Sequence, residues 1–98
     1  MKSMKKVEVV VDSVYLSRAL EILEKSGVSG YTVIRDVLGK GERGLMSGDE
    51  PTDVFKNSYI FTVCEEKTAL RVAEEIKPLL KKVGGLCLLS DVVWIPHR

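Results

Sequence analysis

Short runs of β-branched and aromatic residues alternate along the chain with longer helical patterns. Val, Ile, Thr and Tyr have restricted side-chain rotamers, which suit a pleated strand better than a helix. Within residues 58–64 the alternation places Tyr59, Phe61 and Val63 on one face and Ile60 on the other. The sequence predicts strands over residues 7–11, 31–38, 58–64 and 86–89, with a further short strand over 92–95.

Between these strands, apolar residues recur at three- and four-residue spacing, which is typical of amphipathic helices. One helix is predicted over residues 14–26, with Asp12 as a cap residue before it. A second helical pattern has acidic residues at its start and lysines at its end, and Gly84 and Gly85 stop it. Pro78 lies inside this second pattern and is expected to kink or disturb it.

The predicted order of elements is βαββαβ. This order is that of an α+β, ferredoxin-like fold, in which two helices cover one face of a four-stranded antiparallel sheet. The strands at residues 7–11, 31–38 and 86–89 are apolar on both sides, a pattern expected when both faces of a sheet are buried. Because most soluble oligomers are symmetric homo-oligomers, we expect other copies of the chain to cover the open face, as a ring whose sheets face inward.

Composition narrows the range of functions. A chain of 98 residues is expected to form a single domain over residues 1–98. The net charge of +1 gives no general attraction to nucleic acid or to an anionic membrane. The sequence contains neither an apolar run of the roughly 20 residues that span a bilayer nor the apolar core of a signal peptide. We therefore expect a cytoplasmic protein that does not insert into membranes or bind nucleic acid.

The residue types that carry catalysis or bind metals do not form a recognisable motif. Cys64 and Cys87 lie in apolar runs without metal-ligand spacing, so they are expected to be buried thiols. Asp49, Glu50 and Asp53 are read as solvated loop residues rather than as a dedicated cation site. With neither a nucleophile beside a base nor a paired set of carboxylates, the sequence predicts a protein that is not an enzyme.

A long polar stretch over residues 39–56 separates the second and third predicted strands. Connections of this length without periodicity are uncommon in small domains and are often functional. It opens with three glycines and two cations in Gly39-Lys40-Gly41-Glu42-Arg43-Gly44, where backbone amides and charged side chains can meet an anion such as phosphate. A turn with solvated charges explains the same residues, so the pattern alone leaves both interpretations open.

Two segments together resemble a known family. Gly27-Val28-Ser29-Gly30-Tyr31-Thr32-Val33, followed by the turn Gly39-Lys40-Gly41 and the long loop, is similar to the PII signalling superfamily. The similarity covers nearly the whole chain. Within that superfamily the Gly-Tyr-Thr-Val stretch and the Gly-Lys-Gly turn are most similar to PII-like proteins that respond to inorganic carbon, which are associated with bicarbonate transporters and carboxysomes.

The resemblance implies a homotrimer whose T-loop, at about residues 39–56, changes conformation when adenine nucleotides bind between subunits. Thr32 is then expected beside the adenine, Lys40 or Arg43 at the phosphates, and the second glycine segment in the cleft from the neighbouring chain. The nucleotide contacts implied are Thr32, Gly39, Lys40, Gly41, Arg43, Gly84, Gly85 and Leu86. It further implies bicarbonate as a second ligand, and as effector a membrane bicarbonate transporter or another protein of carbon metabolism, regulated through the T-loop.

The chain departs from the nitrogen-regulating pattern of the superfamily in three places. Residues 39–56 contain no tyrosine for uridylylation, and Glu42 stands where a cation is usual, so Arg43 has to replace it. The second glycine segment lacks the usual phosphate-binding lysine, which favours AMP or ADP over ATP, with cyclic AMP a further candidate. The alternative is a structural or metal-responsive trimer of the same fold that docks proteins without sensing nucleotides.

Overall fold

The computed structural model describes residues 1–39 and 56–97. Its elements follow the predicted βαββαβ order, with one additional short 3₁₀ turn before the first helix. The elements are β1 (Lys2–Asp12), η1 (Ser13–Tyr15), α1 (Leu16–Lys25), β2 (Thr32–Leu38), β3 (Lys56–Cys64), α3 (Glu66–Val83) and β4 (Leu86–Trp94).

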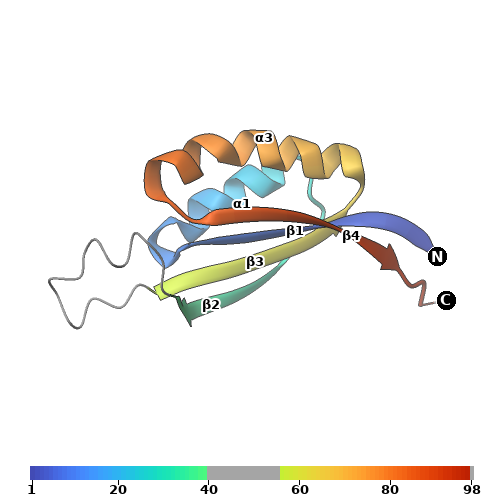
Figure 1. Cartoon of the computed structure of the whole chain (residues 1–98), viewed down its shortest axis with the longest axis horizontal. Helices are drawn as coiled ribbons and strands as arrows, with labels where there is room; N and C mark the ends of the chain where they lie inside the picture. Colours follow the sequence, from blue (N-terminus) through green and yellow to red (C-terminus); the bar gives the residue numbers. More distant parts are fainter. Residues whose placement is uncertain (40–55, 98) are drawn as a thin grey trace, which may run out of the picture.

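The strands form one antiparallel sheet in the order β2-β3-β1-β4, and both helices lie on the same face of it (Figure 1). The ferredoxin-like prediction is therefore confirmed. The division of the last strand into residues 86–89 and 92–95 is wrong, because β4 pairs with β1 without a break from Leu86 opposite Val10 to Trp94 opposite Lys2. Ser90 is polar but keeps its place in the ladder, so polarity alone does not end a strand.

The core lies between the sheet and the helices. Alternate residues of the central strand, Val7, Val9 and Val11, are buried under α1 and α3. Burying an aliphatic side chain of this kind contributes roughly 1.5–3 kcal/mol. The core residues that meet them are Ala19, Ile22, Leu23, Val28, Ile60, Ala69, Val72, Ile76 and Val83.

The start of the first helix differs from its predicted form, and the second helix runs through its proline. Asp12 acts as a cap, as predicted, but its Oδ1 accepts from the Val14 amide at 3.0 Å and so caps the 3₁₀ turn rather than an α-helix. Pro78 does not end α3, which continues to Val83. A proline removes one helical hydrogen bond, and the buried face of α3 continues beyond it. Neither helix in the described ranges combines the length and apolar character needed to cross a bilayer.

The second face of the sheet carries exposed apolar side chains. Ile34 is 51% exposed, Leu88 53% and Trp94 45%, and the pairing register places all three on the face opposite the helices. Single exposed apolar residues are ordinary on a protein surface, but a contiguous group marks an interaction site. The open face is thus apolar on the edge strands β2 and β4 at these positions, whereas β1 places Glu8 on it, so the prediction that residues 7–11 are apolar on both sides does not hold at that residue.

A polar cluster lies within this apolar face. The Tyr59 hydroxyl donates to Glu8 Oε2 at 2.6 Å, and Lys6 Nζ lies 3.7 Å from the same oxygen. Lys6 Nζ also stands 5.0 Å from the centre of the Phe61 ring, within the range of a cation–π contact. Hydrogen bonding to the Glu8 carboxylate stabilises the neutral phenol and raises the pKa of Tyr59.

Gly85 is the residue with the least freedom to be replaced. Its φ is +104°, and a Cβ placed there would lie 2.4 Å from the backbone oxygen of Val10, which the central strand holds in place. We expect Gly85→Ala to lower the free energy of unfolding by at least about 2 kcal/mol, measured by urea denaturation. Gly30→Ala is the control, since a Cβ there would meet nothing within 4 Å, and equal loss in both variants would contradict the assignment.

The Tyr59–Glu8 hydrogen bond predicts a dependence of stability on alkaline pH. Because the pKa of Tyr59 is raised in the folded state, its contribution is fully present below the unfolded value of about 10 and is lost as pH rises through the folded value. Tyr59→Phe should therefore show a shallower fall in unfolding free energy above about pH 10 than the wild type. Parallel curves for the two proteins across that range would argue against the contact.

Candidate functional site

The structure places five of the eight residues implied as nucleotide contacts. Thr32 begins β2 and faces away from the helices, opposite Phe61. Gly39 directly follows β2, and Gly84 and Gly85 join α3 to β4. Leu86 is the first residue of β4. The remaining three, Lys40, Gly41 and Arg43, lie outside the described residues, as do Asp49, Glu50 and Asp53.

Thr32 lines a hollow of about 240 Å³ at the end of the sheet where β3 and β4 finish. The turn after α1 forms one wall, and the last residues of β3 and β4 form the others. Aromatic rings and small polar groups therefore share one space, which is the combination that recognises a planar, polar ring. The lining residues are Ser29, Gly30, Tyr31, Thr32, Phe61, Thr62, Val63 and Trp94.

The turn that forms this wall is held by hydrogen bonds at two points. Thr62 Oγ1 donates to the carbonyl oxygen of Gly30 at 2.5 Å, and the Tyr31 hydroxyl donates to Glu24 Oε2 at 3.1 Å. The second of these raises the pKa of Tyr31, because the Glu24 carboxylate favours the protonated phenol. Arg71 Nη1 adds a bond from α3 to the carbonyl oxygen of Ser26 at 2.9 Å. The hollow is thus set by β3, α1 and α3 before any ligand arrives.

The second glycine segment is a structural turn as well as a predicted contact. Gly84 and Gly85 have φ of +84° and +104°, a region that favours glycine. The Gly84 amide donates to the Leu80 carbonyl oxygen at 2.8 Å, which ends α3. The close approach of Gly85 to Val10 then fixes where β4 begins. The hydrogen bond and the close approach hold the backbone of this turn in place against α3 and β1.

These two parts of the predicted site lie at opposite edges of the sheet. Thr32 is on the edge strand β2 and Leu86 on the edge strand β4, with β3 and β1 between them. Three strand spacings separate them by roughly 14 Å, before any offset along the strands. Each chain therefore presents two separated half-sites.

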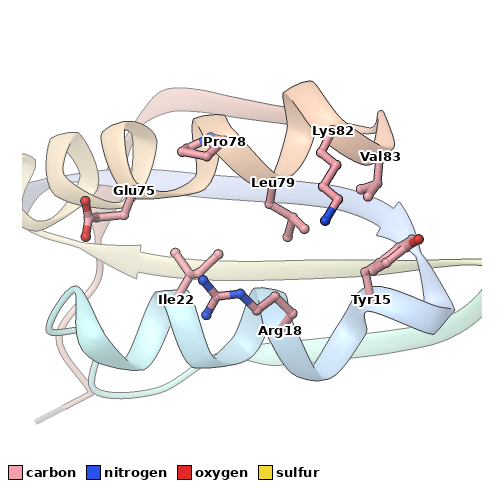
Figure 2. A pocket seen from close by; sticks show the side chains of 8 residues that line it. All are labelled: Tyr15, Arg18, Ile22, Glu75, Pro78, Leu79, Lys82 and Val83. Atoms are coloured by element: carbon pink, nitrogen blue, oxygen red, sulfur yellow. The ribbon is translucent and has the colours of Figure 1, made fainter.

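A larger hollow, of about 360 Å³, lies between α1 and α3 (Figure 2). It contains none of the predicted contacts. Ile22 and Leu79 point toward one another across it, and Arg18 and Lys82 reach it from opposite helices. It opens on the helical side of the molecule, away from the face that carries Thr32 and Trp94.

Neither the thiols nor the carboxylates of the described residues form a chemical centre. Cys64 and Cys87 are half-buried and free, and burial raises the pKa of each thiol. The buried-thiol prediction is correct in direction, although neither side chain is fully enclosed. Over residues 1–39 and 56–97 no group of three or more His, Cys, Asp or Glu side chains is arranged to hold a metal ion.

Thr32 is the one lining residue of the hollow that the sequence named as a contact, and Trp94 is among those that sequence reasoning missed. It is the single tryptophan of the chain and lies at the end of a strand that the sequence pattern broke in two. Its pairing with Lys2 at the end of β1 brings it beside the turn after α1. An isolated Trp near a chain end was the available signal, but only the continuous register of β4 places it.

The structure is similar to those of several solved proteins. CPII from Thiomonas intermedia K12, a nitrogen regulatory PII-like protein solved bound to ADP, AMP and bicarbonate, matches with a TM-score of 0.81 and 23% identity over 97% of each chain. GlnK from B. subtilis, solved as a complex with ATP, matches with a TM-score of 0.63 and 22% identity over 92% of this chain and 82% of that one. A comparison with curated protein sequences gives no match.

Residues 4–97 match the sequence profile of the family described as Nitrogen regulatory protein P-II. Proteins of that family are signalling regulators rather than enzymes, which confirms the expectation from the sequence. The matched segment includes the turn at Thr32, the long connection and the glycines after α3. The chain therefore belongs to the P-II family of signalling proteins.

Proposed function

We propose that this protein is a trimeric sensor that binds an adenine nucleotide at each boundary between subunits. The observation that carries the proposal is the separation of the two half-sites. The hollow at Thr32 is lined by Trp94 at the end of β4, whereas the turn at Gly84 and Gly85 comes before the start of that strand, so a second copy is needed to bring one against the other. CPII, solved with ADP and AMP, and GlnK, solved with ATP, share the fold and support the ligand class.

Each residue has a role in this proposal. Thr32 and Trp94 meet the adenine ring in the hollow. Gly39 and Gly41 give backbone contacts, and Gly84, Gly85 and Leu86 come from the neighbouring chain. Lys40 and Arg43 bind phosphate oxygens. They make these contacts only in the liganded state of the T-loop, at residues 39–56, and so give the ligand a higher affinity for that state. A ligand shifts the loop only as far as it binds one state more tightly than the other.

AMP and ADP are the preferred nucleotides in this proposal, because the glycine turn after α3 continues into Leu86 and Cys87 without a lysine. ATP and cyclic AMP are weaker candidates. Bicarbonate is a second ligand, supported by its presence in the CPII complex with ADP and AMP. The output is regulation of inorganic carbon transport or metabolism in the cytoplasm, through contact of the loop with a bicarbonate transporter or another carbon-related protein. Residues 1–98 act as one domain.

The same open face gives the trimer its interface. Ile34, Leu86, Leu88 and Trp94 are exposed apolar residues on this face, and the Lys6–Glu8–Tyr59 cluster lies among them. Three copies that turn these faces inward bury the apolar residues and leave the helices outside. A polar cluster inside an apolar interface also restricts how the subunits can be rotated, because every buried polar group needs a partner.

Titration with nucleotide tests the ligand. We expect ADP to bind with micromolar affinity in calorimetry and to change the fluorescence of Trp94, which reports from the hollow without other tryptophan signal. Arg43→Ala should weaken ADP binding by roughly tenfold or more, as for loss of a charge-assisted hydrogen bond. Lys67→Ala, which removes a charge from the start of α3, is the control. Absence of binding by AMP, ADP, ATP and cyclic AMP would leave the protein-docking trimer as the function.

Light scattering coupled to size exclusion tests the interface. Leu88→Lys places an ammonium directly across from Glu8, so the folded chain keeps a favourable pair while the apolar interface gains a charge. The variant should elute with the mass of one chain, whereas the wild type has the mass of three. Leu70→Lys, at a 52% exposed position of α3, should remain trimeric. A trimeric Leu88→Lys protein would rule out this face as the interface.

A further inference from the structure

The hollow between α1 and α3 has the volume and the lining expected of a second ligand site. Its volume of about 360 Å³ lies at the lower end of the range for small-molecule pockets. Ile22 and Leu79 face one another across it and give an apolar floor (Figure 2). Pro78 forms part of the wall, where its compact ring leaves space that a longer side chain would occupy. The dimensions suit a small organic molecule rather than a peptide or a second helix.

The charges at its rim select an anion. Lys82 directs its ammonium from α3 toward α1 (Figure 2), and no ion pair joins it to another residue in the described part of the chain. Arg18 reaches the hollow from α1. Its Nη1 donates a hydrogen bond to Glu21 Oε1 at 2.6 Å, which holds the side chain along the helix. The lining carboxylate, Glu75, stands at the end far from Lys82 (Figure 2). Because Arg18 is paired with Glu21, the positive charge at the rim comes chiefly from Lys82 at the end away from Glu75.

The position of the hollow separates it from the proposed nucleotide site. Both helices lie on the face of the sheet opposite Trp94 and Leu88, so the inward-facing trimer leaves the hollow open to solvent. None of its lining residues belongs to the hollow at Thr32. A ligand can therefore occupy it independently of nucleotide.

We propose that the hollow between α1 and α3 binds a small organic monoanion with an apolar body, its carboxylate held by Lys82 and Arg18 and its body resting on Ile22 and Leu79. The apolar floor excludes inorganic anions as the preferred ligand, since they leave it exposed. The cationic rim equally disfavours uncharged compounds of the same shape. One molecule must therefore carry both a negative charge and an apolar body, and this combination defines the ligand class.

Benzoate is the probe, compared with benzamide, which has its shape without its charge, and with inorganic phosphate, which has charge without an apolar body. In ¹H–¹⁵N spectra of the full chain without nucleotide, benzoate should shift the amides of α1 and of the last turns of α3. We expect a dissociation constant on the order of 1 mM and affinities roughly tenfold weaker for benzamide and phosphate.

Two matched substitutions in the same helical turn locate the site. Lys82→Gln should weaken benzoate binding roughly tenfold, whereas Lys81→Gln, whose side chain does not line the hollow, should leave it unchanged. Both positions are exposed, so both variants should fold. Equal affinity in the two variants, equal shifts by benzamide, or no shift in α1 and α3 would each overturn the proposal. Competition by ADP would also overturn it, because it would merge this site with the nucleotide site.

Discussion

The alternation of residues along β1 is the constraint on which the rest of the structure depends. As a central strand, β1 sends Val7, Val9 and Val11 into the helix-covered core and Lys6 and Glu8 to the open face. A slip of one residue would exchange these sets and place charges under the helices. The register therefore fixes the core and the candidate interface with the same pairings.

The distance between the two parts of the predicted site explains why binding and assembly have to be considered together. The hollow at Thr32 includes Trp94 at the end of β4, whereas the glycine turn at Gly85 comes before the start of that strand. A small ligand cannot reach both within one chain. If both belong to one site, each bound molecule stabilises the contact between two copies, and the free energy of ligand binding adds to that of the oligomer.

Most of the fold was predictable because its local signals agree. Valine-rich alternation, helical spacing and paired glycines all indicated the same order of elements, and the structure has that order. The predicted break in β4 is wrong, because Ser90 and Asp91 resemble a turn in sequence but pair with β1 in the structure. Their partners are Lys6 and Lys5, and Lys5 also forms an ion pair with Asp91. Pro78 lies within α3 without ending it, because packing of the α3 face outweighs one lost hydrogen bond.

The candidate site was less predictable, because the register of strand pairing brings its residues together, and their spacing along the sequence does not show it. Trp94 joins Thr32 only because β4 continues to the far end of β1. The hollow between the helices depends on the relative position of α1 and α3, which helical periodicity does not contain. The family resemblance named Thr32 and the glycines as contacts. It could not show that a glycine is needed at position 85 for a structural reason, the close approach of the Val10 carbonyl oxygen, independently of any role in binding.

The fixed position of Gly85 limits which parts of the chain can change conformation when a ligand binds. The turn after α3 is held by the Leu80 carbonyl and by the central strand, and the wall at Gly30 is held by Thr62. At the ends of the long connection, Leu38 is paired with Lys56. Groups fixed in this way are preorganised, so they add to affinity at little cost in ordering but cannot themselves report occupancy. Under the proposed function, a response to ligand therefore has to involve the segment between Leu38 and Lys56 or the relation between subunits, which is why that proposal assigns the differential contacts to Lys40 and Arg43 rather than to the glycines.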